Sequence, residues 1–233
     1  MNDQVSSAYT ENAPQSVASV NSRQRGVRFT IFVLCAFMLT VMLLFINKIT
    51  TPRILSPLEM TANGAHIFDK GRILKDVSLI SEQGTAVGID VFKGQWSLVF
   101  LGFTHCPDIC PTTLATLRDT YQKLRPDFRE QLQVVLLSAD PRRDTAEVLQ
   151  PYIQHFDPDF KALTGEFLEV KRLASQLNMT FVKVKQEQGY TVDHSVNIAI
   201  INPYGHYQGF IKPPLESSRV QLVMQSAMSL WQD

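Results

Sequence analysis

Residues 98–114 read Leu-Val-Phe-Leu-Gly-Phe-Thr-His-Cys-Pro-Asp-Ile-Cys-Pro-Thr-Thr-Leu. The first six residues form a short apolar run, which is typical of a strand buried on both faces. Over residues 112–123 the apolar side chains recur at helical spacing instead. The pattern therefore predicts a buried strand that passes directly into a helix, with Cys106 and Cys110 at the turn between them.

The same strand and helix unit is repeated downstream. Residues 132–138 form a second apolar run, and Asp144 is placed to cap the helix that follows it. Further predicted elements are a short strand near 160–163, a helix over 166–177, a strand over 180–185, a hairpin of 196–201 and 206–211, and an amphipathic helix over 215–231. Parallel strands need crossovers whereas hairpins need only turns, so this order predicts an α/β fold of thioredoxin-like topology, a mixed sheet with flanking helices.

Composition limits the classes of function. The chain has 233 residues, which leaves room for one domain with a hydrophobic core after any terminal segment is set aside, so we expect one domain and not two. Lysine plus arginine equal aspartate plus glutamate at 22 each, so overall charge gives no argument for a nucleic-acid partner. The three cysteines, Cys35, Cys106 and Cys110, are too few for a disulfide scaffold.

Residues 29–46 are uncharged and predict a single transmembrane helix. The small residues of a signal cleavage site do not follow the span, so we interpret it as an uncleaved anchor. Cys35 lies inside the span and is interpreted as a small apolar residue. Arginines precede the span in greater number than basic residues follow it, at Arg23, Arg25 and Arg28 against Lys48 and Arg53. This bias favours a cytoplasmic N-terminus.

Four segments follow from this organisation. We expect a disordered cytoplasmic tail over 1–28, the transmembrane helix over 29–46, a tether over 47–65 and a thioredoxin-like domain over 66–233. The tail does not resemble an Arg-rich mitochondrial transit peptide. The expected location is therefore a bacterial inner membrane, with the C-terminal domain in the periplasm.

The two cysteines at the predicted turn carry the chemistry. Their four-residue spacing places both sulfurs on one face if the turn is helical. A helix N-terminus favours anions, so we expect at least one of the thiols to have a lowered pKa. Thiolates of this kind are nucleophiles and soft metal ligands. In an oxidising compartment Cys106 and Cys110 could instead form a disulfide with a purely structural role.

His194 is the candidate third group. It lies in the sequence Val-Asp-His-Ser at 192–195, which we expect to be a loop before the strand at 196–201 and beside the cysteine turn. The histidine next to the first cysteine, His105, is interpreted as a neighbour of the site and not as a ligand. The other histidines, His66, His155 and His206, are expected at the surface or at strand ends.

Three ordered motifs, at 102–114, 138–145 and 190–195, resemble those of the Sco/SenC family of copper-handling proteins. The resemblance covers the chain from about Leu74 to the C-terminus. It implies one membrane anchor, an exported thioredoxin-like domain, and copper bound by Cys106, Cys110 and His194. It also implies delivery of that copper to the CuA centre of cytochrome c oxidase during assembly.

The residue chemistry agrees with this implication. Two thiolates and one imidazole suit soft Cu(I) and can also hold Cu(II), and they lack the fourth ligand of a structural zinc site. Asp193 is a candidate to orient the loop or to bond the second nitrogen of His194. The charged residues of the segment 140–144 either shape a partner-docking loop or serve as a helix cap and solvated charges.

Two main functions remain open at this point. A copper metallochaperone would act by ligand exchange, without turnover of a substrate, on the copper-bearing oxidase subunit and with other periplasmic copper chaperones or thiol reductants. A thiol-disulfide oxidoreductase would use Cys106 and Cys110 as a redox pair through a mixed disulfide and would not need His194. A thioredoxin-like peroxidase explains neither the cysteine spacing nor the histidine, and copper sensing is a further alternative.

Overall fold

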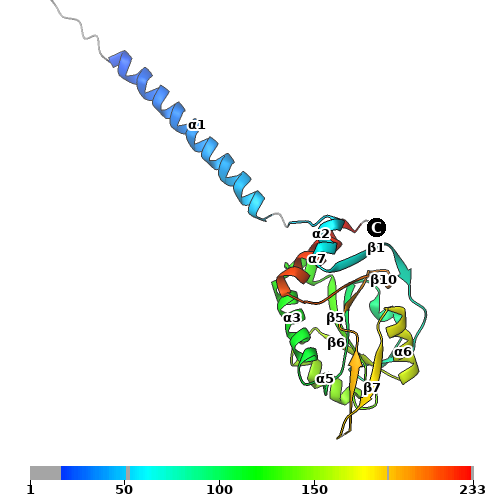
Figure 1. Cartoon of the computed structure of the whole chain (residues 1–233). Helices are drawn as coiled ribbons and strands as arrows, with labels where there is room; N and C mark the ends of the chain where they lie inside the picture. Colours follow the sequence, from blue (N-terminus) through cyan, green and yellow to red (C-terminus); the bar gives the residue numbers. More distant parts are fainter. Residues whose placement is uncertain (1–16, 51–52, 188, 232–233) are drawn as a thin grey trace, which may run out of the picture. The chain divides into compact units, whose positions relative to one another are not determined.

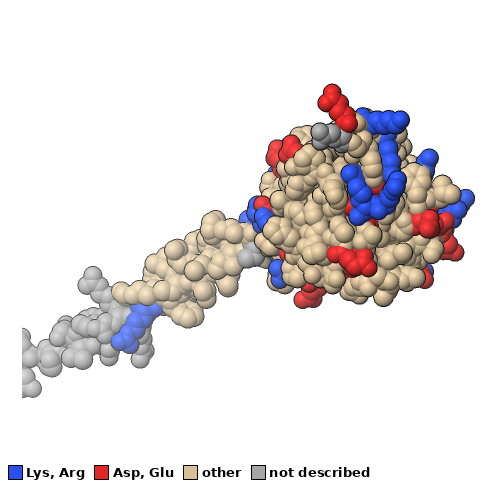
Figure 2. Space-filling view, turned by 90° about the horizontal axis from the view of Figure 1, so that it is seen from below, with Lys and Arg blue, Asp and Glu red and all other residues tan. Residues whose placement is uncertain are grey.

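The computed structural model describes residues 17–50, 53–187 and 189–231, and the chain divides into two compact units, Met1–Pro52 and Arg53–Asp233. The first unit contains helix α1 (Val17–Thr50). Within it, Gly26–Ile49 is long and apolar enough to cross a membrane, with a mean hydropathy of 2.8. In the view of Figure 2 this helix is tan between basic side chains towards its two ends. The expected span over 29–46 lies inside this stretch.

The expected tail over 1–28 differs from the structure where the two can be compared. Residues 1–16 lie outside the described residues, but the backbone is helical from Val17 onward. The polar residues that suggested disorder directly precede a long apolar helix. A helix that is already nucleated can extend into such residues at little cost, which explains the difference.

The second unit is built on an eight-stranded sheet (Figure 1). Its strands in chain order are β1 (Ala65–Ile73), β2 (Leu79–Ser81), β3 (Ala86–Val87), β4 (Trp96–Gly102), β5 (Leu132–Ser138), β6 (Lys161–Thr164), β9 (Ile198–Ile201) and β10 (His206–Ile211). Their order across the sheet is β1-β10-β9-β4-β5-β6-β2-β3. Strands β4, β5 and β6 are parallel, whereas β9 pairs antiparallel with β4 and with β10. The predicted mixed sheet is therefore confirmed.

Helices cover both faces of the sheet. Strands β4, β5 and β6 lie side by side in chain order, so right-handed crossovers put α3 (Ile109–Lys123) and α5 (Ala146–Gln154) on the same face. Helix α7 (Ser217–Leu230) packs against α3, and α6 (Phe167–Gln176) lies on the other side of β5 and β6 in Figure 1. Two short helical segments, η1 (Ile89–Phe92) and α4 (Pro126–Arg129), lie in the connections.

The core runs through the centre of this sheet. Every residue of β4, β5 and β9 is buried, which agrees with their near-continuous apolar sequences. This packing makes the carboxyl end of β4 a rigid support for the residues that follow it. In open α/β sheets, that edge is where ligands usually bind.

The segment 47–65, expected to be a tether, contains a folded element. Helix α2 (Pro57–Ala62) begins with a capping box in which Ser56 and Glu59 bond each other's backbone. Leu55 and Met60 are buried in the core cluster at 1% and 4% exposure. The domain boundary stays a prediction, but this part of the segment contributes to the core.

A second difference concerns the residues before β9. Strands β7 (Phe181–Lys185) and β8 (Tyr190–His194) form a separate two-stranded antiparallel sheet, which we call the ribbon. The expectation of a loop at 192–195 was therefore wrong for His194, which ends β8. Strand β8 carries polar and charged residues, and its partner β7 is mostly exposed, so the segment lacks the apolar run that identifies a buried strand.

Candidate metal centre

The two cysteines lie just beyond the carboxyl end of β4. The Cys106 N–H donates to the Phe103 carbonyl at 3.2 Å, which closes a tight turn after the strand. Cys110 lies in the first turn of α3, and its N–H donates to Cys106 Sγ at 3.4 Å. Both cysteines are free thiols. Strand, turn and helix start together bring both sulfurs to one place, as the sequence predicted.

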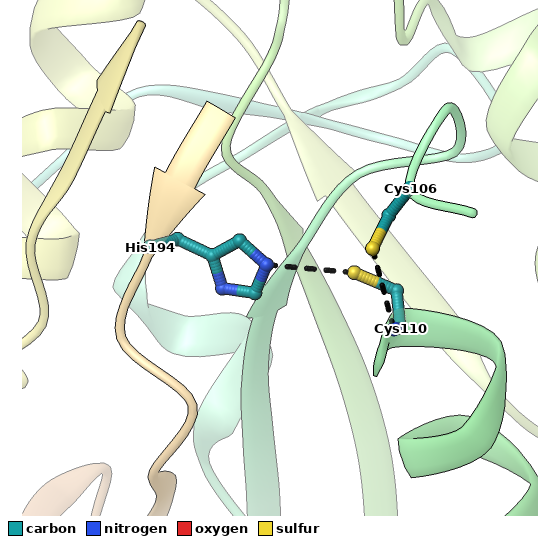
Figure 3. A group of neighbouring side chains, drawn as sticks. All are labelled: Cys106, Cys110 and His194. Atoms are coloured by element: carbon teal, nitrogen blue, oxygen red, sulfur yellow. Dashed lines mark hydrogen bonds between the residues drawn. The ribbon is translucent and has the colours of Figure 1, made fainter. Parts of the chain in front are cut away.

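His194 reaches the sulfurs from the ribbon (Figure 3). Its Nε2 lies 3.5 Å from Cys110 Sγ, and ligand atoms of Cys106, Cys110 and His194 all lie within 4.8 Å of one another. These three residues are up to 88 positions apart in the sequence. Among the described residues, they form the cluster of cysteine, histidine and acidic side chains that could bind a metal ion. The structure thus brings together all three predicted site residues.

The second ring nitrogen of His194 has its own partner. Nδ1 lies 2.9 Å from the Ser195 carbonyl oxygen, which can only accept a hydrogen bond, so Nδ1 carries the proton. In the neutral imidazole, this hydrogen bond leaves the lone pair on Nε2, the nitrogen that lies 3.5 Å from Cys110 Sγ. A partner on the remote nitrogen is the usual way in which a metal-binding histidine is oriented.

The expected role of Asp193 in this hydrogen bond was wrong. Neighbouring residues of a strand point to opposite faces, and Asp193 is exposed beside the half-buried His194. The partner is instead a main-chain carbonyl. Since every residue carries a carbonyl, no sequence signal could have identified Ser195.

Aromatic side chains form the apolar side of the site. The rings of Phe100 and Phe103 contact the His194 ring edge to face, with centroids 6.0 and 5.8 Å away. Gly102 lies between them on the chain, and a Cβ there would come within 2.6 Å of Phe100 Cε1 and 3.1 Å of Cys110 Sγ. The side chains around Gly102 are therefore packed too closely to accept an added methyl group without moving.

Burial dominates the electrostatics of Cys110. The side chain is fully buried, and this raises the pKa of its thiol, against the lowering effect of a backbone hydrogen bond with Phe103. Cys110 is therefore not a thiol with the lowered pKa expected for at least one of the pair, because desolvation has the largest effect on it. A metal ion that binds here must displace the thiol proton.

The two aspartates of the segment 140–144 are buried, whereas Arg142 is exposed. Asp144 was expected to cap α5, but Thr145 is the N-cap residue and Asp144 is completely buried. Its carboxylate accepts hydrogen bonds from the Thr104 hydroxyl at 2.6 Å and from the Ser138 hydroxyl at 2.7 Å. It also accepts one from the Thr104 N–H at 3.2 Å. Asp144 therefore holds the turn that leads into Cys106.

The remaining histidines stay outside the cluster of three donors within the described part of the chain. His105 is exposed, and its Nδ1 lies 3.0 Å from the Thr104 hydroxyl. This arrangement agrees with its interpretation as a neighbour of the site. His66 stacks on Phe210 and His155 contacts Phe156, each in another part of the domain.

Comparison with known proteins identifies the family. The SCO1/SenC family model matches residues 67–229, most of the chain. The chain belongs to the SCO1/SenC family. A relative from Stutzerimonas stutzeri is 37% identical over 159 residues, which cover 68% of this chain and 78% of the relative. The resemblance found in the sequence motifs is thus confirmed.

Solved Sco structures share the fold. Arabidopsis thaliana ScoI with copper bound is 30% identical with a TM-score of 0.63, over 67% of this chain and 99% of that chain. Yeast Sco1 with copper bound is 27% identical with a TM-score of 0.63, over 69% of this chain and 91% of that chain. Two solved members of the SCO1/SenC family therefore hold copper on this architecture.

Proposed function

We propose that this chain binds one copper ion through Cys106, Cys110 and His194 and passes it to a partner protein. The observation that carries the proposal is the meeting of two sulfurs and one imidazole nitrogen within 4.8 Å. Two thiolates and an imidazole are a soft donor set that suits Cu(I) and can also hold Cu(II). Three ligands leave copper accessible to an incoming donor.

The proposed recipient is the CuA centre of cytochrome c oxidase during its assembly. Membership in the SCO1/SenC family supports this choice. The copper is cargo, and its transfer is an exchange of ligands in which a donor of the oxidase subunit replaces one donor of this chain at a time. Other periplasmic copper chaperones or thiol reductants are the proposed sources of copper and electrons.

The proposed location is a bacterial inner membrane, with α1 as a single-pass anchor and the domain in the periplasm. The apolar stretch Gly26–Ile49 supports an anchor. The excess of arginines before the span supports a cytoplasmic N-terminus. An exported domain would then reach the same compartment as an extracytoplasmic copper centre.

A second candidate function is reduction of a disulfide in the copper-receiving protein. Cys106 is partly exposed whereas Cys110 is buried beside it, which is the arrangement of an attacking thiol and a resolving thiol. Cys106 would attack one sulfur of the target disulfide, and Cys110 would then release the mixed disulfide. The target gains two electrons and two protons, and Cys106 and Cys110 become a disulfide.

An anaerobic titration with Cu(I) against a competing chelator distinguishes these functions. The protein is the reduced full chain in detergent with Cys35→Ala, so that only the site cysteines remain. We expect a one-to-one complex that His194→Ala weakens at least tenfold, or about 1.4 kcal/mol. His155→Ala is the matched control and should leave the affinity unchanged.

The opposite pattern would favour the reductase. Weak copper binding that is indifferent to His194→Ala, together with full reduction of a model disulfide by the same variant, would contradict the copper proposal. The reaction would then depend on Cys106 and Cys110 alone.

A further inference from the structure

The ligand His194 lies on an element that the main sheet does not hold. Strands β7 and β8 pair with each other and with no strand of the eight-stranded sheet among the described residues. At the base of the ribbon, the Ser195 N–H donates to the Thr180 carbonyl at 2.9 Å, which joins its two strands. Apart from the short chain connection from His194 to Ile198 of β9, side-chain contacts therefore hold the ribbon against the domain.

One face of β8 makes these contacts. Tyr190, Val192 and His194 are two residues apart and share that face, because side chains alternate along a strand. Val192 is only 5% exposed, which marks this face as the packed one. Tyr190 is thus placed to fix one end of the same face that carries the ligand at the other end.

The Tyr190 side chain is bound to a buried carboxylate. Its hydroxyl donates to Asp140, with both carboxylate oxygens at 3.1 Å, and Asp140 has no exposed surface. Arg143 forms an ion pair with the same carboxylate, and Lys183 Nζ of β7 lies 3.7 Å from it. A buried carboxylate needs such partners, so Asp140 holds the ribbon from both of its strands.

Arg143 adds a second connection to Tyr190. Its guanidinium lies 4.1 Å from the centre of the Tyr190 ring, and its Nη1 donates to the Tyr190 carbonyl at 3.4 Å. It also lies 5.9 Å from the centre of the Phe103 ring, which contacts the His194 ring. Arg143 therefore fills the space between the ribbon and the turn after β4.

The same segment holds the other half of the site. Asp144, four residues after Asp140, binds Thr104 and so fixes the turn that leads to Cys106. The two carboxylates thus connect one short rigid segment to both halves of the donor set. Asp140 binds Tyr190 on the strand that carries His194, and Asp144 binds Thr104 in the turn that leads to Cys106.

We propose that Tyr190, Asp140 and Arg143 are positioning residues for His194, and that they set its distance from the two sulfurs. This inference rests on the proposed copper site. None of the three residues supplies a ligand atom, and Tyr190 shares a face of β8 with His194, so we expect the Tyr190 contact to act on copper through His194. Loss of the Tyr190 hydroxyl should let the ribbon move and lower the affinity that the histidine contributes.

A double-mutant cycle tests this dependence, because residues that act through one another are not additive. Cu(I) affinity is measured by chelator competition for Tyr190→Phe, His194→Ala and the double variant, all in the full chain with Cys35→Ala. We expect Tyr190→Phe to weaken binding about fivefold to tenfold when His194 is present and to have no further effect in His194→Ala. Tyr204→Phe, which removes an exposed tyrosine hydroxyl elsewhere in the domain, is the control.

The remaining outcomes are also decisive. An equal loss of Cu(I) affinity in both backgrounds would show a general structural effect. No loss of affinity in either background would show that the Tyr190 hydroxyl does not affect copper binding. Either result overturns the inference. If Tyr190→Phe does not fold, as judged by its circular dichroism, Arg143→Lys is taken through the same cycle with the same expectation. A His194→Ala variant that binds copper like its parent would instead overturn the proposed function itself.

Discussion

At Gly102 the backbone of β4 passes so close to the site that only a hydrogen atom fits. A Cβ would lie 2.6 Å from Phe100 Cε1 and 3.1 Å from Cys110 Sγ. Gly102→Ala should therefore displace the Cys110 sulfur and the Phe100 ring that contacts His194. We expect a loss of about 1–3 kcal/mol in the free energy of unfolding and at least tenfold weaker Cu(I) binding. Urea unfolding and chelator competition measure the two effects.

Gly88→Ala provides the matched control. A Cβ at Gly88 would meet the Val77 carbonyl at 3.7 Å, an ordinary van der Waals distance. This variant should bind copper as its parent does. Normal copper affinity in Gly102→Ala would show that the site has more room than the structure indicates.

Cys110 should behave as an unusually weak acid in the metal-free protein. Burial raises the pKa of its thiol, so the thiolate fraction at neutral pH is small and grows about tenfold with each pH unit. Alkylation of Cys110 by iodoacetamide should therefore keep accelerating from about pH 7 to about pH 10. Peptide mass spectrometry of the reduced full chain follows this residue separately. A rate that levels off below about pH 8.5 would mean an ordinary or lowered pKa.

At the scale of elements, α2 is part of the folded domain. Met60 is 4% exposed, and Met60→Ala should lower the free energy of unfolding by about 2–5 kcal/mol, because it leaves a cavity in the core. Leu58 lies two residues earlier on the same helix but is 80% exposed. Leu58→Ala should change the stability by less than about 0.5 kcal/mol. Equal effects of the two substitutions on urea unfolding would mean that α2 does not pack in solution.

The elements that were most clearly predicted are those with a continuous apolar run or with apolar residues at helical spacing. Strands β4 and β5 are continuous apolar runs, and α3 has apolar residues at helical spacing, so burial follows from the pattern itself. Helix α2 has only six residues, too few for a period to be recognised. Its capping box at Ser56 and Glu59 was a signal that could have found it. In the ribbon, β7 matches the strand predicted over 180–185, whereas β8 has no apolar run and was expected to be a loop at 192–195.

In the metal centre, too, one part could be predicted from the sequence and another part could not. Spacing and motif identified Cys106, Cys110 and His194 because ligand chemistry depends on residue type. The supporting contacts depend on the tertiary fold instead. An aspartate before a helix can cap it or accept hydrogen bonds from a distant turn, and only the structure shows that Asp144 binds Thr104. A main-chain partner such as the Ser195 carbonyl leaves no trace in the sequence at all.

For the whole molecule, the account requires the domain and the N-terminus to lie on opposite sides of a membrane. Alkaline phosphatase folds to its active form only where disulfides can form, in the periplasm. A fusion after Asp233 should therefore be active in bacterial cells, and a fusion before Met1 should be inactive. The reverse pattern would contradict the proposed orientation of α1, which depends on Arg23, Arg25 and Arg28.

X-ray absorption of the Cu(I)-loaded full chain with Cys35→Ala tests the proposed three-ligand centre most directly. The structure brings two sulfurs and one imidazole nitrogen together, so the predicted coordination shell has two sulfur scatterers and one nitrogen scatterer. The outer-shell signal of the imidazole ring should disappear in His194→Ala and persist in His155→Ala. A shell of two sulfurs alone, unchanged by His194→Ala, would show that the histidine is not a ligand and would contradict the account.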